Sequence, residues 1–112
     1  MLLVNKGDIV FVNFPFEEDG TIYKSRPCLV LAVDDENKKF LAAKITTTPL
    51  NRSWAVELKQ GTEDMKTGSL RSESWINLNR REWIPYSDYI FKIGSINADI
   101  LLRVMQKMQN KI

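Results

Sequence analysis

The hydrophobic pattern of this chain changes its period once, near residue 96, and this change limits the possible folds more than any other feature. Before that point, apolar residues form short blocks or alternate with polar ones, as Trp54, Val56 and Leu58 do, which is typical of strands. After it, apolar residues recur at the spacing of one helix face, at Ile96, Ile100, Leu101, Val104, Met105 and Met108. No helical pattern precedes this tail, which argues against a βαβ unit.

Turn and capping residues place the elements more closely. Pro15 ends a first strand, a long hairpin loop spans residues 16–25, and Asn97 is the expected N-cap of the helix. We expect strands at residues 8–14, 28–33, 40–45, 54–59, 74–78 and 88–93, with a polar connection at 61–69. The pattern predicts one domain over residues 1–112, mainly β with a C-terminal helix, folded as a small, strongly curved barrel or half-barrel.

The residue types that the chain lacks exclude several kinds of chemistry. It contains no histidine and a single cysteine, Cys28, which rules out histidine acid–base pairs, Ser-His-Asp triads and nearly all zinc sites. Its glycines lie far apart, which rules out Gly-rich phosphate-binding loops. A net charge of +2 is too weak to indicate a nucleic-acid partner by itself. We expect no metal and no cofactor.

The apolar segments are too short for a membrane protein. The longest run, residues 28–33, falls far below the ~18 residues of a membrane span. Polar residues 5–8 follow the first apolar residues too closely for a signal peptide, and one cysteine gives no disulfide framework. We expect a cytoplasmic protein without membrane contact.

Several segments follow one another in an order that is characteristic of one family. They are residues 7–15 (Gly-Asp-Ile-Val, then Asn-Phe-Pro), 26–31 (Arg-Pro-Cys-Leu-Val-Leu), 42–46 (Ala-Ala-Lys-Ile-Thr), 68–76 (Gly-Ser-Leu, then Ser-Trp-Ile) and 93–96 (Ile-Gly-Ser-Ile). With them the chain resembles, over nearly its whole length, the MazF/PemK/Kid toxins of bacterial type II toxin–antitoxin systems. The resemblance implies an SH3-like barrel of the CcdB/PemK type, a homodimer, and metal-independent, sequence-selective cleavage of single-stranded RNA. It also implies a cognate antitoxin, whose short acidic segment folds onto the toxin.

The resemblance further assigns roles in catalysis. Arg26 is implied to be the main catalytic residue, with Thr46 as its hydroxyl partner. In the implied reaction the ribose 2′-OH attacks the adjacent phosphorus and leaves a 2′,3′-cyclic phosphate and a 5′-hydroxyl. Arg26 would donate hydrogen bonds to the phosphoryl oxygens as charge develops. The structural alternative for Arg26 is a salt bridge at the barrel rim, with Asp8 or Glu57.

The same resemblance suggests which residues bind RNA. They are Phe16, Lys24, Thr47, Thr48, Asn79 and Arg80. Thr47 and Thr48 are also close enough in sequence to replace Thr46 as the hydroxyl partner. Where the family often carries Gln-Ile-Arg-Thr, residues 80–83 are Arg-Arg-Glu-Trp, a departure that bears on cleavage specificity. The alternative for Phe16 is a purely structural role in closing the barrel.

The general base is not identified by the sequence. An arginine, whose pKa lies above ~12, is a poor proton acceptor at neutral pH. The acidic residues of the first loop are the candidates: Glu17, Glu18 and Asp19.

Two other functions fit the same barrel. One is a toxin that binds DNA gyrase without catalysis, as the related CcdB-like proteins do. Those proteins end in Trp-Gly-Ile, whereas residues 109–112 are Gln-Asn-Lys-Ile, so the nuclease is favoured. The other is an inactive barrel that serves only as a binding module, against which the presence of both Arg26 and Thr46 argues.

Overall fold

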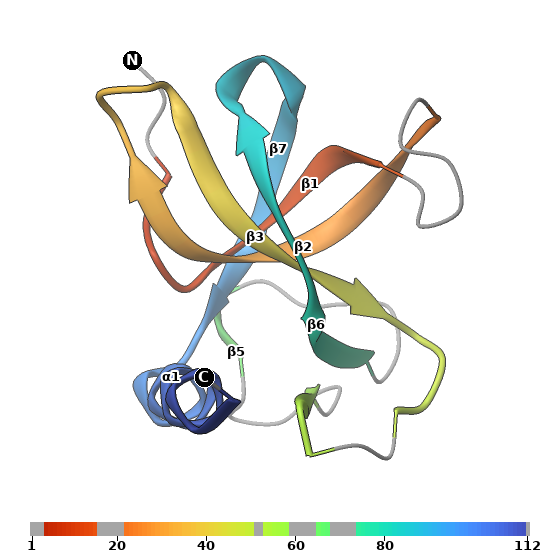
Figure 1. Ribbon diagram of the computed structural model, residues 1–112, viewed down its shortest axis with the longest axis vertical. Helices are drawn as coiled ribbons and strands as arrows, with labels where there is room; N and C mark the ends of the chain where they lie inside the picture. Colours follow the sequence, from red (N-terminus) through yellow and green to blue (C-terminus); the bar gives the residue numbers. More distant parts are fainter. Residues whose placement is uncertain (1–3, 16–21, 51–52, 59–64, 68–73, 112) are drawn as a thin grey trace.

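One curved antiparallel sheet and one helix make up the fold (Figure 1). The computed structural model describes residues 4–15, 22–50, 53–58, 65–67 and 74–111. In this part of the chain the elements are β1 (Asp8–Pro15), β2 (Tyr23–Asp34), β3 (Lys39–Thr46), β4 (Ala55–Leu58), β5 (Met65–Thr67), β6 (Ser74–Pro85), the 3-10 turn η1 (Tyr86–Asp88), β7 (Tyr89–Ile96) and α1 (Ala98–Lys111). The strands are ordered β4-β6-β3-β2-β1-β7-β5, so β2 lies at the centre, as its predicted burial on both faces requires.

The sheet packs a separate hydrophobic core against each of its faces. On β2, Leu29 and Leu31 belong to the core that α1 covers, here called the helix-side core. Cys28 and Val30 belong to the other, here called the strand-side core, because successive residues of a strand point to opposite faces. The buried members of the strand-side core are Val4, Val10, Val12, Phe14, Cys28, Val30, Phe40, Ala42 and Ile84. The same strands therefore hold both cores together.

β6 contributes to both cores because a bulge reverses its two faces midway. Ile76 lies in the helix-side core and Ile84 in the strand-side core, although regular alternation would place both on the same face. The register between β3 and β6 shifts between Ala43 and Lys44, and leaves residues 78–80 out of the ladder. Extra residues on one strand of an antiparallel pair bend that strand and re-aim the side chains beyond them.

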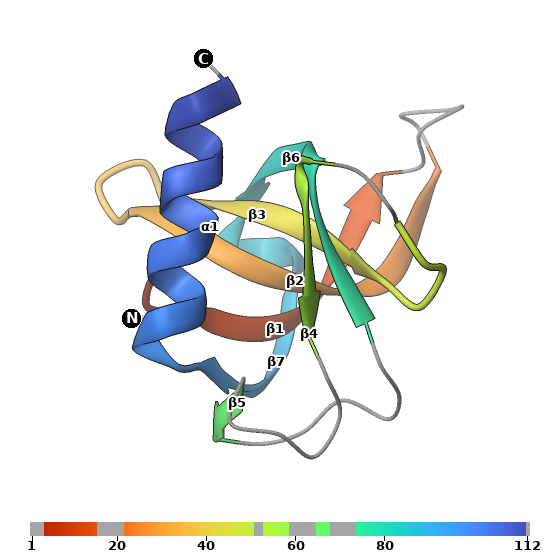
Figure 2. The same cartoon turned by 90° about the horizontal axis from the view of Figure 1, so that it is seen from below.

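α1 begins at the residue that the sequence predicted. The Asn97 side chain accepts a hydrogen bond from the backbone N–H of Ile100, with an Oδ1–N distance of 2.9 Å, so the predicted N-cap is confirmed. Figure 2 shows α1 lying across the sheet, where Ile100 and Val104 are buried in the helix-side core. Over the ranges that the structure describes, no helix has the length and apolar character needed to cross a membrane.

The predicted fold class is confirmed, but the start of the second strand is wrong. β2 begins at Tyr23 rather than at Cys28, so the predicted hairpin loop of residues 16–25 is too long. Residues 23–25 are exposed and show no apolar alternation. They join the sheet because their backbones pair with residues 13–15 of β1, which no hydrophobic pattern reveals.

Three later predictions are also corrected. β6 continues to Pro85 instead of ending at residue 78, since its bulge interrupts the alternation from which the strand was predicted. β7 runs through Gly94 to Ile96; the Gly94 backbone stays in the ladder opposite Ile9. β5 lies within the predicted polar connection 61–69 and pairs with β7.

Candidate functional site

Basic side chains line up on the strand-side face, beyond the apolar core. Lys24 lies opposite Phe14, and Arg26 lies opposite Val12. Directly opposed residues of an antiparallel pair share a face, and both Phe14 and Val12 belong to the strand-side core. β3 continues the row, because Lys44 lies opposite Cys28. Alternation along β3 adds Thr46 to this face. We call Lys24, Arg26, Lys44 and Thr46 the basic face.

The charges of Arg26 and Lys44 act on the same buried thiol. Cys28 is fully buried between them, and this burial raises the pKa of its thiol. The two positive charges act in the opposite direction, as nearby cations favour the thiolate, but burial dominates. Cys28 is therefore an inert core residue. Lys44 lies opposite it on β3, and Arg26 lies two residues before it on β2.

Thr46 is the threonine that the structure places on the basic face. It is the last residue of β3 and is half-buried opposite Trp75, whereas Thr47 and Thr48 are exposed in the bend that follows. The Thr48 backbone N–H donates a hydrogen bond to Thr46 Oγ1 over 3.1 Å. This bond uses one acceptor site of the hydroxyl and leaves its O–H to donate elsewhere. The turn thus holds the hydroxyl oxygen in place, and its O–H can still donate.

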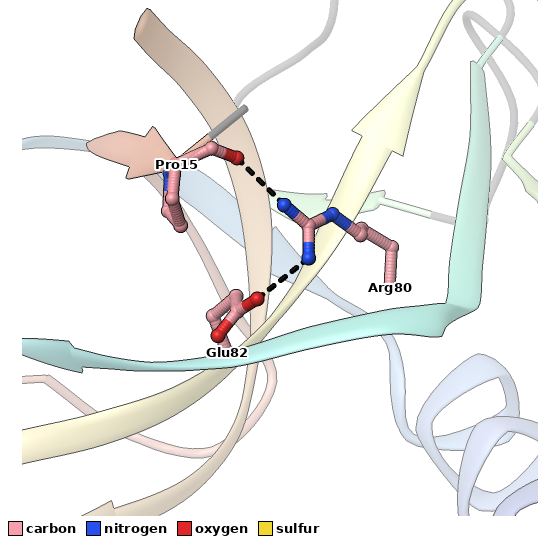
Figure 3. Close-up of polar contacts among 3 residues, drawn as sticks. All are labelled: Pro15, Arg80 and Glu82. Atoms are coloured by element: carbon pink, nitrogen blue, oxygen red, sulfur yellow. Dashed lines mark hydrogen bonds and ion pairs between the residues drawn. The ribbon is translucent and has the colours of Figure 1, made fainter. Parts of the chain in front are cut away.

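Arg80 is held by the protein itself (Figure 3). Its Nη1 lies 2.6 Å from Glu82 Oε1, and its Nη2 donates to the Pro15 carbonyl over 2.8 Å. The guanidinium carbon lies 5.3 Å from the centre of the Phe14 ring, a distance at which a cation and an aromatic face attract each other. The side chain is only 20% exposed. Arg80 therefore borders the basic face as a largely internal group.

Two residues that the sequence analysis did not select lie in the same region. Lys44 is on the basic face, and Asn77 lies opposite it on β6. Asn77 Oδ1 accepts a hydrogen bond from the Asn79 backbone N–H over 3.0 Å, which fixes the start of the bulge. Alternation in Ala42-Ala43-Lys44-Ile45-Thr46 would have put Lys44 beside Thr46. The position of Asn77 depends on the β3–β6 register and has no such signal.

The remaining predicted site residues fall elsewhere. Asn79 is exposed at the bulge. Phe16 and the candidate bases Glu17, Glu18 and Asp19 lie outside the described residues. In the ranges that are described, no group of three or more cysteine or carboxylate side chains is placed to hold a metal ion.

The two proposed salt-bridge partners of Arg26 lie on β1 and β4. The Asp8 carboxylate, at the opposite end of β1, lies 3.2 Å from Lys92 Nζ and accepts a hydrogen bond from the Asn5 backbone N–H over 2.9 Å. Glu57 is on β4, opposite Trp75; because Trp75 also lies opposite Thr46, Glu57 shares the face of Thr46. Asp8 therefore stabilises the start of β1 rather than the basic face.

Solved toxin structures share this curved sheet and C-terminal helix. The Mycobacterium tuberculosis toxin MazF-mt6 is 19% identical, with a TM-score of 0.67 over 90% of this chain and 93% of that one. A mycobacterial endoribonuclease in complex with its cognate antitoxin is 12% identical, with a TM-score of 0.72 over 96% and 93% of the two chains. The MazE–MazF structure from Deinococcus radiodurans gives 17% identity and a TM-score of 0.68 over 99% and 96%. The chain thus has the fold of this class of toxins.

A family model makes the relationship definite. The model of PemK-like, MazF-like toxins of type II toxin–antitoxin systems matches residues 5–112. The chain therefore belongs to this family of toxins. No curated protein sequence matches it.

Proposed function

We propose that this toxin is a metal-independent, sequence-selective endoribonuclease that cleaves single-stranded RNA. The observation that supports the proposal is the alignment of Arg26, Lys44 and Thr46 on one face of two neighbouring strands. Two cations and a hydroxyl on rigid strands suit the binding of a phosphodiester whose charge increases in the transition state. Endoribonuclease activity is also ascribed to structures of the same fold.

The proposed reaction needs only groups of the RNA and of this face. The ribose 2′-OH loses its proton and attacks the adjacent phosphorus, and the bond from phosphorus to the 5′-oxygen breaks. The products are a 2′,3′-cyclic phosphate and a 5′-hydroxyl, which takes up a proton. Arg26 donates a fork of hydrogen bonds to the phosphoryl oxygens, and Lys44 adds positive charge beside it. The Thr46 hydroxyl donates to a non-bridging or leaving oxygen.

Proton transfer requires a group other than these. An arginine is a poor proton acceptor at neutral pH. Among the described carboxylates, Glu82 is bound to Arg80 and Asp8 to Lys92, whereas Glu57 shares the face of Thr46, on the other side of Trp75. The candidates for the general base are therefore Glu57 and the first-loop residues Glu17, Glu18 and Asp19.

We further propose the partners that this reaction implies. RNA on both sides of the bond to be cleaved is bound by the exposed Lys24 and by the remaining candidates, which are Phe16, Thr47, Thr48 and Asn79. An acidic antitoxin segment covers the surface around Lys24 and Arg26 and blocks RNA, by charge complementarity. Arg81 lies opposite Ala43 of the helix-side core, so it is not part of this surface. The active form is a cytoplasmic homodimer.

The proposal is tested by incubating purified protein in EDTA with a long single-stranded RNA and with DNA of the same sequence. We expect discrete RNA fragments that end in cyclic phosphate, and intact DNA, because DNA lacks the attacking 2′-OH. The fragment ends also give the cleavage motif. Intact RNA, with protein that is folded and free of antitoxin, would overturn the proposal and favour gyrase binding or an inactive barrel.

A further inference from the structure

Arg80 connects two strands that are not neighbours in the sheet. It leaves β6 within the bulge of residues 78–80, and its guanidinium reaches the carbonyl of Pro15, the last residue of β1. In the sheet order, β3 and β2 lie between β6 and β1. The contact is possible because the sheet is strongly curved, which brings β6 over the strand-side core towards β1 (Figures 1 and 3). Arg80 thus closes this end of the core.

The end of β1 that Arg80 holds is the support of the basic face. Residues 23–27 of β2 pair with β1, but they precede the β2–β3 ladder, which begins at Cys28. Lys24 and Arg26 therefore take their position from β1 alone among the strands of the described ladders. Pro15 lies opposite Tyr23, one residue before Lys24. Whatever fixes Pro15 also fixes the strand segment that carries Arg26.

The bonds of Arg80 are suited to this supporting role. Its two terminal nitrogens contact Glu82 and Pro15, and its guanidinium carbon lies over the ring of the buried Phe14. A lysine, with a single ammonium group, does not reproduce a planar fork that spans two partners. The Arg80 side chain is largely buried, whereas Lys24 is exposed.

We propose that Arg80, oriented by Glu82, is a positioning residue for Lys24 and Arg26 and does not bind RNA through its charge. This inference rests on the proposed ribonuclease function. It replaces the sequence-based assignment of Arg80 as an RNA contact. The bulge in β6 makes this role possible, because it directs the Arg80 side chain across the strand-side core instead of along the strand.

The dependence of RNA binding on salt separates the two roles. The probe is a short single-stranded RNA with 2′-O-methyl groups, which cannot attack the phosphorus. A side chain that neutralises an RNA phosphate contributes about 0.7 to the slope of log Kd against log salt concentration. For Arg80→Met we expect a fall in kcat on the order of 10²-fold, because a displacement of about 1 Å already misplaces Arg26 for the reaction. The slope should stay unchanged, because so small a displacement leaves the charges of Lys24 and Arg26 beside their phosphates. The matched control, Lys24→Met, should lose about 0.7 of slope. A slope that falls equally in Arg80→Met would overturn the proposal.

The partner carboxylate gives a test of opposite sign. If Arg80 is a positioning residue, Glu82→Gln lowers kcat as Arg80→Met does, and the double variant is no worse than either single one. If Arg80 binds RNA, removing Glu82 releases the arginine and removes a negative charge, so that kcat or affinity is maintained or rises. That second result would overturn the proposal.

A measurement without RNA keeps this inference separate from the proposed function. In free Arg80→Met protein we expect faster amide hydrogen exchange in the β1–β2 ladder at residues 23–26 than in wild type, with exchange in α1 unchanged. Unchanged exchange at 23–26 would contradict the positioning role, whether or not the protein cleaves RNA. If wild-type protein cleaves no RNA, the proposed function fails, and exchange alone decides whether Arg80 fixes this segment.

Discussion

The two cores are built from the same strands, yet different groups cover their outer sides. The helix-side core is covered by α1, whose Ile100 and Val104 are buried against it. The strand-side core is bordered by Arg80 lying over Phe14, and the basic face continues from it along β2 and β3. Neighbouring residues of β2, such as Cys28 and Leu29, belong to opposite cores.

This difference separates stability from function within a small molecule. A helix that covers a sheet gives an extended apolar interface, which contributes chiefly to folding. The strand-side core stops at the rim of the curved sheet. Beyond it, the same rigid strands carry the polar groups of the basic face and hold them in a fixed geometry. Substitutions on the helix side should therefore change stability, and substitutions on the basic face should change activity.

The largest effect expected is that of Arg26→Ala. Loss of a group that donates to the developing phosphoryl charge should lower the RNA cleavage rate by about 10²–10³-fold. The free energy of unfolding should change by about 1 kcal/mol, well below the cost of a core substitution, because the side chain is only half-buried at the rim. The matched control is Arg103→Ala on the exposed side of α1, which should cleave like wild type. An unchanged cleavage rate in Arg26→Ala would refute the mechanism.

The converse effect is expected from Leu29→Ala on the helix side. Removing this fully buried side chain should lower the free energy of unfolding by about 2–5 kcal/mol, since it leaves a cavity. Urea unfolding followed by circular dichroism measures the change, and cleavage per folded molecule should remain that of wild type. Val33→Ala, at a 39% exposed position of the same strand, is the control and should stay within about 0.5 kcal/mol.

A smaller effect on the helix side is expected from Asn97→Ala. The substitution removes the oxygen that accepts the Ile100 N–H bond, and loss of an N-cap typically costs about 1 kcal/mol. Asn97→Asp keeps an acceptor and should retain most of the stability. If the alanine and aspartate variants unfold at the same urea concentration, the cap does not contribute to the free energy of unfolding.

The smallest effect concerns Tyr86, which packs against the strand-side core. Its O–H donates to Asp35 Oδ1 over 2.7 Å, and this bond is the main reason that the pKa of Tyr86 is raised from 10.0 to about 12. The native state keeps the phenol proton that the unfolded chain loses. This contribution is therefore complete below pH about 10 and is lost as the pH rises towards 12.

The tyrosine prediction is checked by urea unfolding from pH 9 to 12 for wild type and Tyr86→Phe. The wild-type protein should lose more stability over this range than the variant. Asp35→Asn, which removes the acceptor charge, should behave like Tyr86→Phe. Parallel curves for wild type and Tyr86→Phe would show that the bond does not persist in solution.

The sequence predicted those features that local patterns determine. Asn97 was identified because a capping residue preceded a helical repeat, and the central strand because residues 28–33 are apolar on both faces. The resemblance to a family led to Arg26 and Thr46, which β2 and β3 carry on the same face. These predictions needed no knowledge of which strands pair across the sheet.

The features that were missed depend on long-range register and curvature. The contact of Arg80 with Pro15 joins residues 65 positions apart, and no spacing in the sequence indicates it. The continuation of β6 was missed because its alternation changes phase at the bulge, so that Leu78 and Ile84 fall in different cores.

The β6 bulge also determines which changes of length this toxin tolerates. Because side chains alternate with a period of two, removing one residue from 78–80 would exchange the two faces of the strand beyond it. Ile84 would leave the strand-side core, and Glu82 would turn away from Arg80. Removing two residues would keep both on their present faces. Natural length variation at this point should therefore come in pairs of residues, and single insertions or deletions should accumulate elsewhere in the chain.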